Sequence, residues 1–413
     1  MGMLNPRRFL FALAILSLPL SYSVKFMLGW NEVTWVAPSL IIALLLTLFL
    51  RIKQSANFLL LIAAALTSAF FGSIILKAFG ISFSLYDTLR DPVKLILNVN
   101  FFAVCFRFFM KEREFAIKWV SISVICQFIV GVLFMLSAYD VIELPVNIQE
   151  FTKGYRARQV LWLSDTVGIM RMGGSFIEAP PFGLFMLASV VILYLEKIRH
   201  NRSRWVKRGL FFATLGVLCS LSTQILLAFF VIAAGEVYRL QKKTGKEILL
   251  VVGILFLFCV FPIKAIHSLQ EKMSEENPGG HGLGGSVGER TFHIQNYFSM
   301  IKENPQMIPF GIGMGQYGKY TASVHENLKD TITPQVLPID WLSGFGLVGT
   351  SIMLVILLNI GKRVRRAYNF LGLLSFVGLL LANMFQSSWL WEAWFMALAY
   401  MNIPSEEKET KLG

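Results

Sequence analysis

The sequence predicts an all-α, polytopic integral membrane protein, and three observations support this fold class. The chain of 413 residues is 55% hydrophobic, only 15% of its residues are charged, and its mean hydropathy is +0.61. Apolar runs of roughly 17 to 25 residues recur along it, which is the length needed to cross a hydrocarbon core of ~30 Å. Basic residues gather in alternate gaps between these runs. We therefore expect a single membrane domain, residues 1–413, with about twelve transmembrane helices.

The apolar runs give the predicted spans in chain order. They lie at residues 9–28, 34–50, 57–79, 93–109, 116–138, 180–196, 208–220, 223–238, 248–265, 341–360, 368–384 and 388–402. The seventh is short, and a polar stretch at 220–224 separates it from the eighth, so this pair could instead be a broken or re-entrant element. Arg7 and Arg8 precede the first run as in a signal peptide, but no small-residue cleavage pattern follows, and we keep it as a span.

The distribution of Lys and Arg predicts the orientation of the spans. Basic gaps lie at residues 51–53, 107–118, 197–208, 239–246 and 362–366. Short basic loops stay in the cytoplasm, so these gaps and both termini are expected on the cytoplasmic side. The topology then explains the net charge of +13, and no nucleic acid partner is needed to account for it.

Only two gaps between spans are long, and both are expected on the opposite, outer side. They are residues 139–179, the first outer loop, and residues 266–340, the second outer loop. Long ordered connections usually carry function, because fixing them costs conformational entropy. An enzyme on the outer side works without cytosolic nucleotides, so a group that it transfers must arrive already activated.

The first outer loop carries three arginines where the orientation rule expects few positive charges. They are Arg156, Arg158 and Arg171, and Glu178 follows them. A surface helix that binds lipid headgroups would explain them. A clamp for an anionic ligand would also explain them, because a guanidinium matches phosphate oxygens with a planar fork of donors. We favour the clamp because the second outer loop repeats the theme.

The second outer loop contains a predicted amphipathic helix. The segment 286–289 fits a capping box, and the helix should run from about Arg290 to Glu303 and end before Pro305. Helical spacing places Arg290, His293 and Tyr297 along one stripe beside an apolar stripe. Such a helix on the outer membrane face suits a lipid-linked phosphate. An interfacial helix with a snorkelling arginine is the alternative.

Two motifs in the second outer loop resemble nucleotide-binding sequences, and we reject both. Gly313, Gly315 and Gly318 match the dinucleotide spacing, and Gly318-Lys319 ends most of a phosphate-loop pattern. Neither follows a strand in a βαβ unit. We expect these glycines to let the backbone approach a sugar or a neighbouring helix closely. The chain shows no metal-ligand spacing of Cys or His, so we expect no metal site and no cofactor.

Four stretches of the chain carry a resemblance to a known family. They are Arg171–Gly183, Ser220–Ser222, Glu289–Arg290 followed by the segment up to Tyr317, and Gly346–Gly349 at the start of the tenth span. In this order and spacing, and with twelve spans, the chain resembles the O-antigen polymerase and O-antigen ligase family of polytopic membrane glycosyltransferases.

The resemblance implies a metal-independent enzyme in the bacterial inner membrane with its active site facing the periplasm. It would move a glycan from undecaprenyl diphosphate to a sugar hydroxyl. The family's diphosphate-binding role falls on Arg290 and Arg171, with Arg158 and Arg156 assisting. Contacts to the diphosphate or glycan are then expected from His293, Tyr297 and Tyr317. Expected partners are an undecaprenyl-diphosphate-linked oligosaccharide, membrane lipids, and the chain-length regulator and flippase of the same pathway.

The catalytic base is the point at which the chain departs from the ligase branch. That branch places a histidine before the Gly-x-x-Gly of the tenth span, where this chain has Gln335 and Val336. The nearest histidine is His325, which is our first choice as base for the acceptor hydroxyl, with Glu178 and Asp340 behind it. The departure favours a polymerase of O-antigen, capsule or exopolysaccharide over a ligase that transfers polymer to lipid A core.

Two further alternatives stay open at this point. A lipid-linked oligosaccharide flippase would also have many spans, but it should carry ionisable residues at mid-span and related halves. Glu392 is the one clear acid inside a predicted span. A scaffold protein of a polysaccharide assembly complex would not need the outward arginines. The polar groups at one face therefore favour an enzyme.

Overall fold

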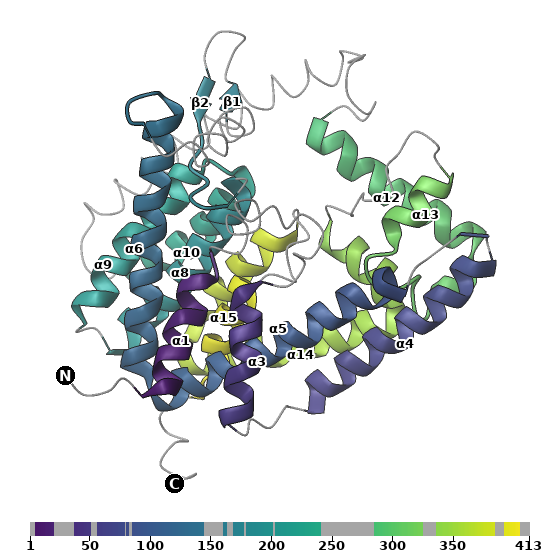
Figure 1. The fold of residues 1–413 in the computed structure, drawn as a ribbon, viewed down its shortest axis with the longest axis horizontal. Helices are drawn as coiled ribbons and strands as arrows, with labels where there is room; N and C mark the ends of the chain where they lie inside the picture. Colours follow the sequence, from purple (N-terminus) through teal and green to yellow (C-terminus); the bar gives the residue numbers. More distant parts are fainter. Residues whose placement is uncertain are drawn as a thin grey trace.

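The structure, a computed structural model, describes most of the predicted spans and part of each outer loop (Figure 1). The described residues are 5–19, 37–50, 56–78, 80–81, 85–143, 160–162, 168–176, 179–200, 203–240, 285–324, 336–384 and 392–404. Helices make up nearly all of them. The exceptions include a short antiparallel pair of strands in the first outer loop, β1 (Val160–Trp162) and β2 (Gly168–Met170).

Most of the described helices overlap predicted spans, but α1 ends at Ser17, inside the predicted first span, 9–28. The helices are α1 (Pro6–Ser17), α3 (Pro38–Leu50), α4 (Ala56–Ala78), α5 (Leu85–Lys111), α6 (Arg113–Ala138), α8 (Ala179–His200), α9 (Arg204–Ser220), α10 (Thr223–Leu240), α12 (Gly285–Glu303), α13 (Tyr317–Val324), α14 (Leu337–Met384) and α15 (Glu392–Met401), with a 3-10 turn at Pro305–Met307. Five of them, α4, α5, α6, α8 and α14, are long and apolar enough to cross a membrane. The fold is that of a helical membrane protein; the count of twelve spans stays a prediction.

The described helices are broken between the seventh and eighth predicted spans, within the tenth predicted span, and near the start of the eleventh. Helix α9 ends at Ser220, Leu221 takes a left-handed conformation with a φ of 45°, and α10 begins at Thr223. This confirms the predicted interruption of the seventh and eighth spans. Helix α14 covers the tenth and eleventh spans and is interrupted at Gly346 and Asn369. The predicted ninth span, 248–265, lies outside the described residues.

Helix ends that the sequence assigns to the cytoplasm meet at one end of the molecule. Arg8 at the start of α1 pairs with Glu112 at 2.5 Å, beside the turn between α5 and α6. Arg113 pairs with Glu196 near the end of α8 at 2.8 Å, and both bond the hydroxyl of Tyr400 near the end of α15. The strands and α12 lie at the opposite end in Figure 1. The described residues of the basic gaps 107–118 and 197–208 and those of the outer loops therefore lie at opposite ends of the helix bundle.

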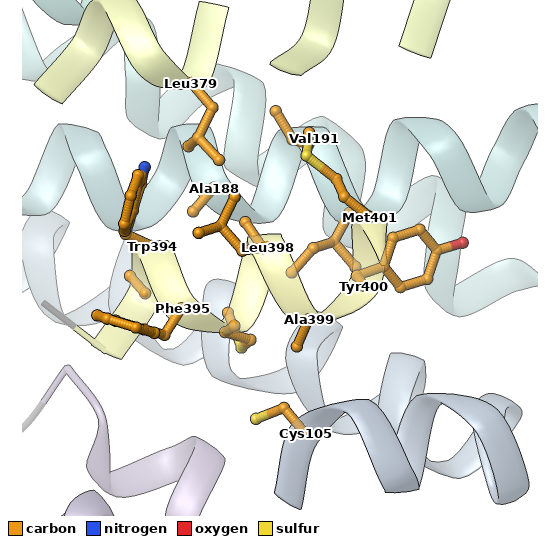
Figure 2. Close-up of a cluster of buried hydrophobic side chains, with 14 of the residues drawn as sticks. Cys105, Ala188, Val191, Leu379, Trp394, Phe395, Leu398, Ala399, Tyr400 and Met401 are labelled. Atoms are coloured by element: carbon orange, nitrogen blue, oxygen red, sulfur yellow. The ribbon is translucent and has the colours of Figure 1, made fainter. Parts of the chain in front are cut away.

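Helices α8 and α15 form the centre of the bundle. In Figure 2, Trp394, Phe395 and Leu398 of α15 pack beside residues of α8 and α14, and every residue from 393 to 401 is buried. Other helices expose large apolar side chains: Leu48 of α3 is 74% exposed and Phe70 of α4 is 64% exposed. Apolar side chains turned outward are typical of helices that face lipid.

Candidate functional site

The second outer loop returns to the bundle and docks into the first break of α14. The N–H of Ile312 donates to the carbonyl of Ser343 at 2.7 Å. Beyond the break, the N–H of Leu347 donates to Ile308 O at 2.9 Å, and that of Val348 to Pro309 O at 3.1 Å. Gly346 makes the break possible with a φ of 63°. The loop thus satisfies backbone groups that the interrupted helix leaves unpaired.

Helix α4 holds the same loop from the other side. The hydroxyl of Ser68 donates to the carbonyl of Gly344. Gly72 lies so close to the carbonyl of Ile312 that any Cβ there would collide with it. The rings of Phe71 and Phe310 stack at a centroid distance of 4.9 Å. The loop therefore approaches a neighbouring helix closely, and the glycine that permits this approach is Gly72 of α4.

The docked loop also contacts an ion pair at the start of α5. Arg90 donates from Nε to Asp91 Oδ1 at 3.1 Å and from Nη2 to Oδ2 at 3.4 Å. The side chains are 35% and 18% exposed. Gly315, with a φ of 72°, lies directly against the carboxylate of Asp91. A carboxylate and a partly exposed guanidinium thus lie beside the glycine turn, where the first can accept hydrogen bonds and the second can donate them to an anion.

Sequence reasoning missed Arg90 and Asp91. The gap before the fourth predicted span is short, whereas the candidate residues of the sequence lie in the two long outer loops. The signal was nevertheless present. Arg90 is an arginine in an outward gap, which is the same exception to the orientation rule that singled out Arg156, Arg158 and Arg171.

Helix α12 is fixed to α13 by a buried polar network. Asn296 donates from Nδ2 to the hydroxyl of Tyr317 and to that of Thr321, both at 3.0 Å. The Tyr317 hydroxyl donates to the carbonyl of His293 at 3.1 Å, and His293 Nδ1 lies 3.3 Å from the Tyr317 hydroxyl oxygen. Burial raises the pKa of Tyr317, which favours the protonated phenol that donates in this network. These contacts hold α12 in one orientation.

The helix in the second outer loop ends at Glu303, as the sequence predicts, but begins at Gly285, earlier than expected. The stripe of His293 and Tyr297 is buried, and two residues of the adjacent apolar stripe are exposed. Ile294 is 38% exposed and Phe298 is 63% exposed. Burial raises the pKa of Tyr297 to about 12. The predicted glycan contacts of this stripe therefore belong to side chains that pack inside, and their role in binding stays a prediction.

Arg290 and Arg171 are both half-buried. Arg290 lies in the second turn of α12, on the same side as His293. Arg171 follows β2, and in Figure 1 β2 and α12 lie at the same end of the molecule but on separate sides of it. Within the described residues, the structure brings His293 and Tyr317 together, but it does not bring the two arginines together.

The chain after Arg171 docks into the other helix break. The N–H of Met172 donates to the carbonyl of Cys219 at 2.8 Å, just before the break at Leu221. The hydroxyl of Ser175 lies 2.7 Å from Pro19 O and 2.8 Å from Gln127 Oε1. Two of the four stretches that carry the family resemblance thus meet here, and the other two meet at Gly346.

Four predicted site residues, Arg156, Arg158, Glu178 and His325, have no described side chain. Among the described residues, no group of three or more His, Cys, Asp or Glu side chains could hold a metal ion. Comparison of the chain with models of protein families and with curated proteins gives no match to either.

Proposed function

We propose that the protein is a bacterial polysaccharide polymerase of the inner membrane. It transfers a glycan from undecaprenyl diphosphate to a sugar hydroxyl of another lipid-linked repeat unit at the periplasmic face. The observation that carries the proposal is the docking of the second outer loop on α4 and α14. This docking fixes α12, with Arg290, on the end of the bundle opposite the short basic loops.

The arginines supply what this reaction needs most. Negative charge develops on the diphosphate as the glycosyl bond breaks, and pre-placed guanidinium groups stabilise that charge. We assign this role to Arg290 and Arg171, with Arg158 and Arg156 as further candidates. Arg90 is a further candidate, because it is partly exposed and its partner Asp91 lies against Gly315 of the docked loop.

The acceptor hydroxyl must lose its proton to a base as it attacks the sugar carbon. His325 remains the first candidate from the sequence, with Glu178 and Asp340 behind it. The structure adds Asp91, whose carboxylate is held by Arg90 against Gly315.

The exposed apolar stripe of α12 fits a lipid-linked substrate. Ile294 and Phe298 face outward on the helix that carries Arg290. A helix with this pattern lies in the interface of a bilayer with its apolar side chains among the acyl chains. In that position Arg290 would lie at the depth of the headgroups, together with the diphosphate of a polyprenyl lipid.

The test is an in vitro polymerisation with the purified full-length protein in detergent. Undecaprenyl-diphosphate-linked repeat units are supplied with chelator and without nucleotide, and products are separated on a gel. We expect a ladder of lengthened lipid-linked glycans. Arg290→Ala should lose it, and so should Arg290→Lys, because lysine cannot form the two parallel hydrogen bonds of a guanidinium. Lys302→Ala, a change to an exposed cation of the same helix, is the matched control and should keep the ladder.

Other products would reassign the protein. Transfer to an added lipid A core acceptor without a ladder would make it a ligase. If neither product forms and the protein moves lipid-linked oligosaccharide across proteoliposomes, it is a flippase. A ladder from Arg290→Ala as strong as the wild type would overturn the assignment of the diphosphate site.

A further inference from the structure

A cavity lies at the opposite end of the bundle from the proposed site. Its volume is about 490 Å³, within the range of ~300–1,000 Å³ that is typical of ligand pockets. Three helices and one further residue line it: the start of α4, the last turns of α5, the middle of α14, and Asn402, which follows α15. The sequence assigns these segments to the cytoplasmic side.

The inner wall of the cavity is apolar. Phe58 and Phe102 are buried and pack at a ring-centroid distance of 4.7 Å, and Phe106 lies next to Phe102 at 6.3 Å. Ile356 and Ile360 of α14 face them. A surface of this kind accommodates acyl chains rather than a freely soluble ion.

The mouth of the cavity is cationic. Arg107, Lys111 and Arg363 are in the lining, and no acidic residue is. Arg113, a half-buried arginine at this end, pairs with Glu196 at 2.8 Å. Arg107 is also half-buried, but it forms no ion pair within the described chain. A half-buried cation without an acidic neighbour favours an anion in the adjoining space.

Three amide side chains complete the lining. Asn57, Asn359 and Asn402 contribute donors and acceptors, and Asn402 accepts from Arg363 Nη1 at 2.6 Å. A glycerophospholipid has ester carbonyls and, in phosphatidylglycerol, glycerol hydroxyls that amides can bond. The headgroup of a polyprenyl phosphate has only its phosphate oxygens. The amides therefore favour the glycerophospholipid.

We propose that this cavity binds an anionic glycerophospholipid of the phosphatidylglycerol type, with its phosphate between Arg107 and Arg363 and its acyl chains against the phenylalanines. This lipid comes from the membrane leaflet that contacts the basic helix ends. The proposal does not depend on glycosyl transfer, so it survives if the polymerase assignment fails.

The test is native mass spectrometry of the full-length protein in detergent, titrated separately with dioleoyl phosphatidylglycerol, dioleoyl phosphatidylcholine and undecaprenyl phosphate. We expect one saturable phosphatidylglycerol and at least tenfold weaker binding of the other two. The double variant Arg107→Gln/Arg363→Gln should weaken phosphatidylglycerol binding roughly thirtyfold. Arg204→Gln/Arg208→Gln is the matched control; it removes two exposed cations at the same end, outside the cavity lining, and should bind as the wild type does.

A second variant separates the cavity from surface charge. Ala103→Leu adds apolar volume to the lining and removes no charge, so it should also weaken binding. Equal loss in the cavity and control double variants would overturn the proposal in favour of a diffuse surface effect. Preference for undecaprenyl phosphate, or displacement of the lipid by millimolar inorganic phosphate, would overturn the glycerophospholipid assignment. Binding to Ala103→Leu at wild-type strength would place the lipid outside the cavity.

Discussion

The two helix breaks receive a docked loop in the same way but depend on different residues. At the α9–α10 break, the chain turns through Leu221 with a φ of 45°, and Met172 N–H bonds the carbonyl of Cys219. At the α14 break, it turns through Gly346 with a φ of 63°, and Ile312 N–H bonds the carbonyl of Ser343. Both breaks lie where an outer loop meets the helix bundle.

The difference lies in what occupies the space around each turn. Backbone atoms of Pro309, Phe310 and Gly311 lie where a Cβ on Gly346 would be. Leu221 has a half-buried side chain, so its left-handed turn has room and carries only the conformational cost of about 1–2 kcal/mol. The docking at Gly346 therefore depends on the absence of a side chain. The docking near Leu221 depends on the hydrogen bonds of its polar neighbours.

Of the changes that test this comparison, Gly346→Ala should have the largest effect on local stability. The added methyl group collides with backbone that cannot rotate away, and alanine is strained at a φ of 63°. We expect a loss of about 3–5 kcal/mol of local stability. Hydrogen exchange followed by mass spectrometry should show faster exchange in the segment 308–315.

Leu221→Gly is the reciprocal change at the other break. Glycine relieves the left-handed strain but adds unfolded-state entropy, so the net change should stay within about 1 kcal/mol. Exchange near Met172 should then match the wild type. If Gly346→Ala exchanges no faster than Leu221→Gly, the two breaks do not differ as we argue.

Tyr317→Phe should have an intermediate effect. The change removes the hydroxyl that bonds Asn296 and the carbonyl of His293, and it leaves these buried groups with fewer partners. We expect a loss of about 1–3 kcal/mol, seen as a lower midpoint of thermal unfolding in detergent. Tyr297→Phe is the matched control, because Tyr297 is a buried tyrosine whose hydroxyl has no bond within the described residues. An equal loss in both variants would assign the effect to packing.

Ser175→Ala tests the docking of residues 171–176 at the α9–α10 break, where the effect should be smaller. It removes the hydroxyl contacts to Pro19 O and Gln127 Oε1 but leaves the N–H of Ser175 bonded to Gln127 at 3.2 Å. We expect about 1 kcal/mol, measured by hydrogen exchange around residues 171–176. Ser189→Ala should change less, since that hydroxyl bonds only a carbonyl of its own helix, at 2.9 Å. No change with Ser175→Ala would mean that the hydroxyl of Ser175 does not anchor the segment, and the backbone bonds of Met172 and Ser175 would then carry the docking.

Local signals in the sequence predicted local features well. Pro305 marked the end of α12, and the polar stretch at 220–224 marked the break between α9 and α10. Both features depend on residues that are neighbours in the chain, so a pattern of residue types is enough to find them.

Features that depend on distant residues escaped prediction. The fit of Gly72 against Ile312 and of Asp91 against Gly315 joins segments more than 200 residues apart. The burial of one stripe of α12 and the exposure of two residues of the adjacent one reflect α13, which covers His293 but leaves Phe298 exposed. Helical spacing shows which residues share a face, but only the packed neighbours decide which face is covered.

Raised pH should weaken the packing of α12 against α13 before it weakens the docking of residues 171–176. We expect this effect to be the smallest, because it is absent at neutral pH. Burial raises the pKa of Tyr297 to about 12 from an ordinary value of 10.0, and it also raises the pKa values of Tyr317 and Tyr320. The unfolded phenols ionise first as the pH rises. The stabilisation is therefore complete below about pH 10 and is lost progressively toward about pH 12.

Hydrogen exchange at about pH 8 and about pH 11, corrected for the intrinsic rate, measures this loss in each segment. Residues 293–321 should lose protection at the higher pH, while residues 171–176, where the described bonds involve no tyrosine, should lose less. Tyr297→Phe removes one of the three phenols and should reduce the dependence without abolishing it. The same pH dependence in the variant and the wild type would mean that Tyr297 ionises equally in both states, and the difference in protection between the segments would then rest on Tyr317 and Tyr320.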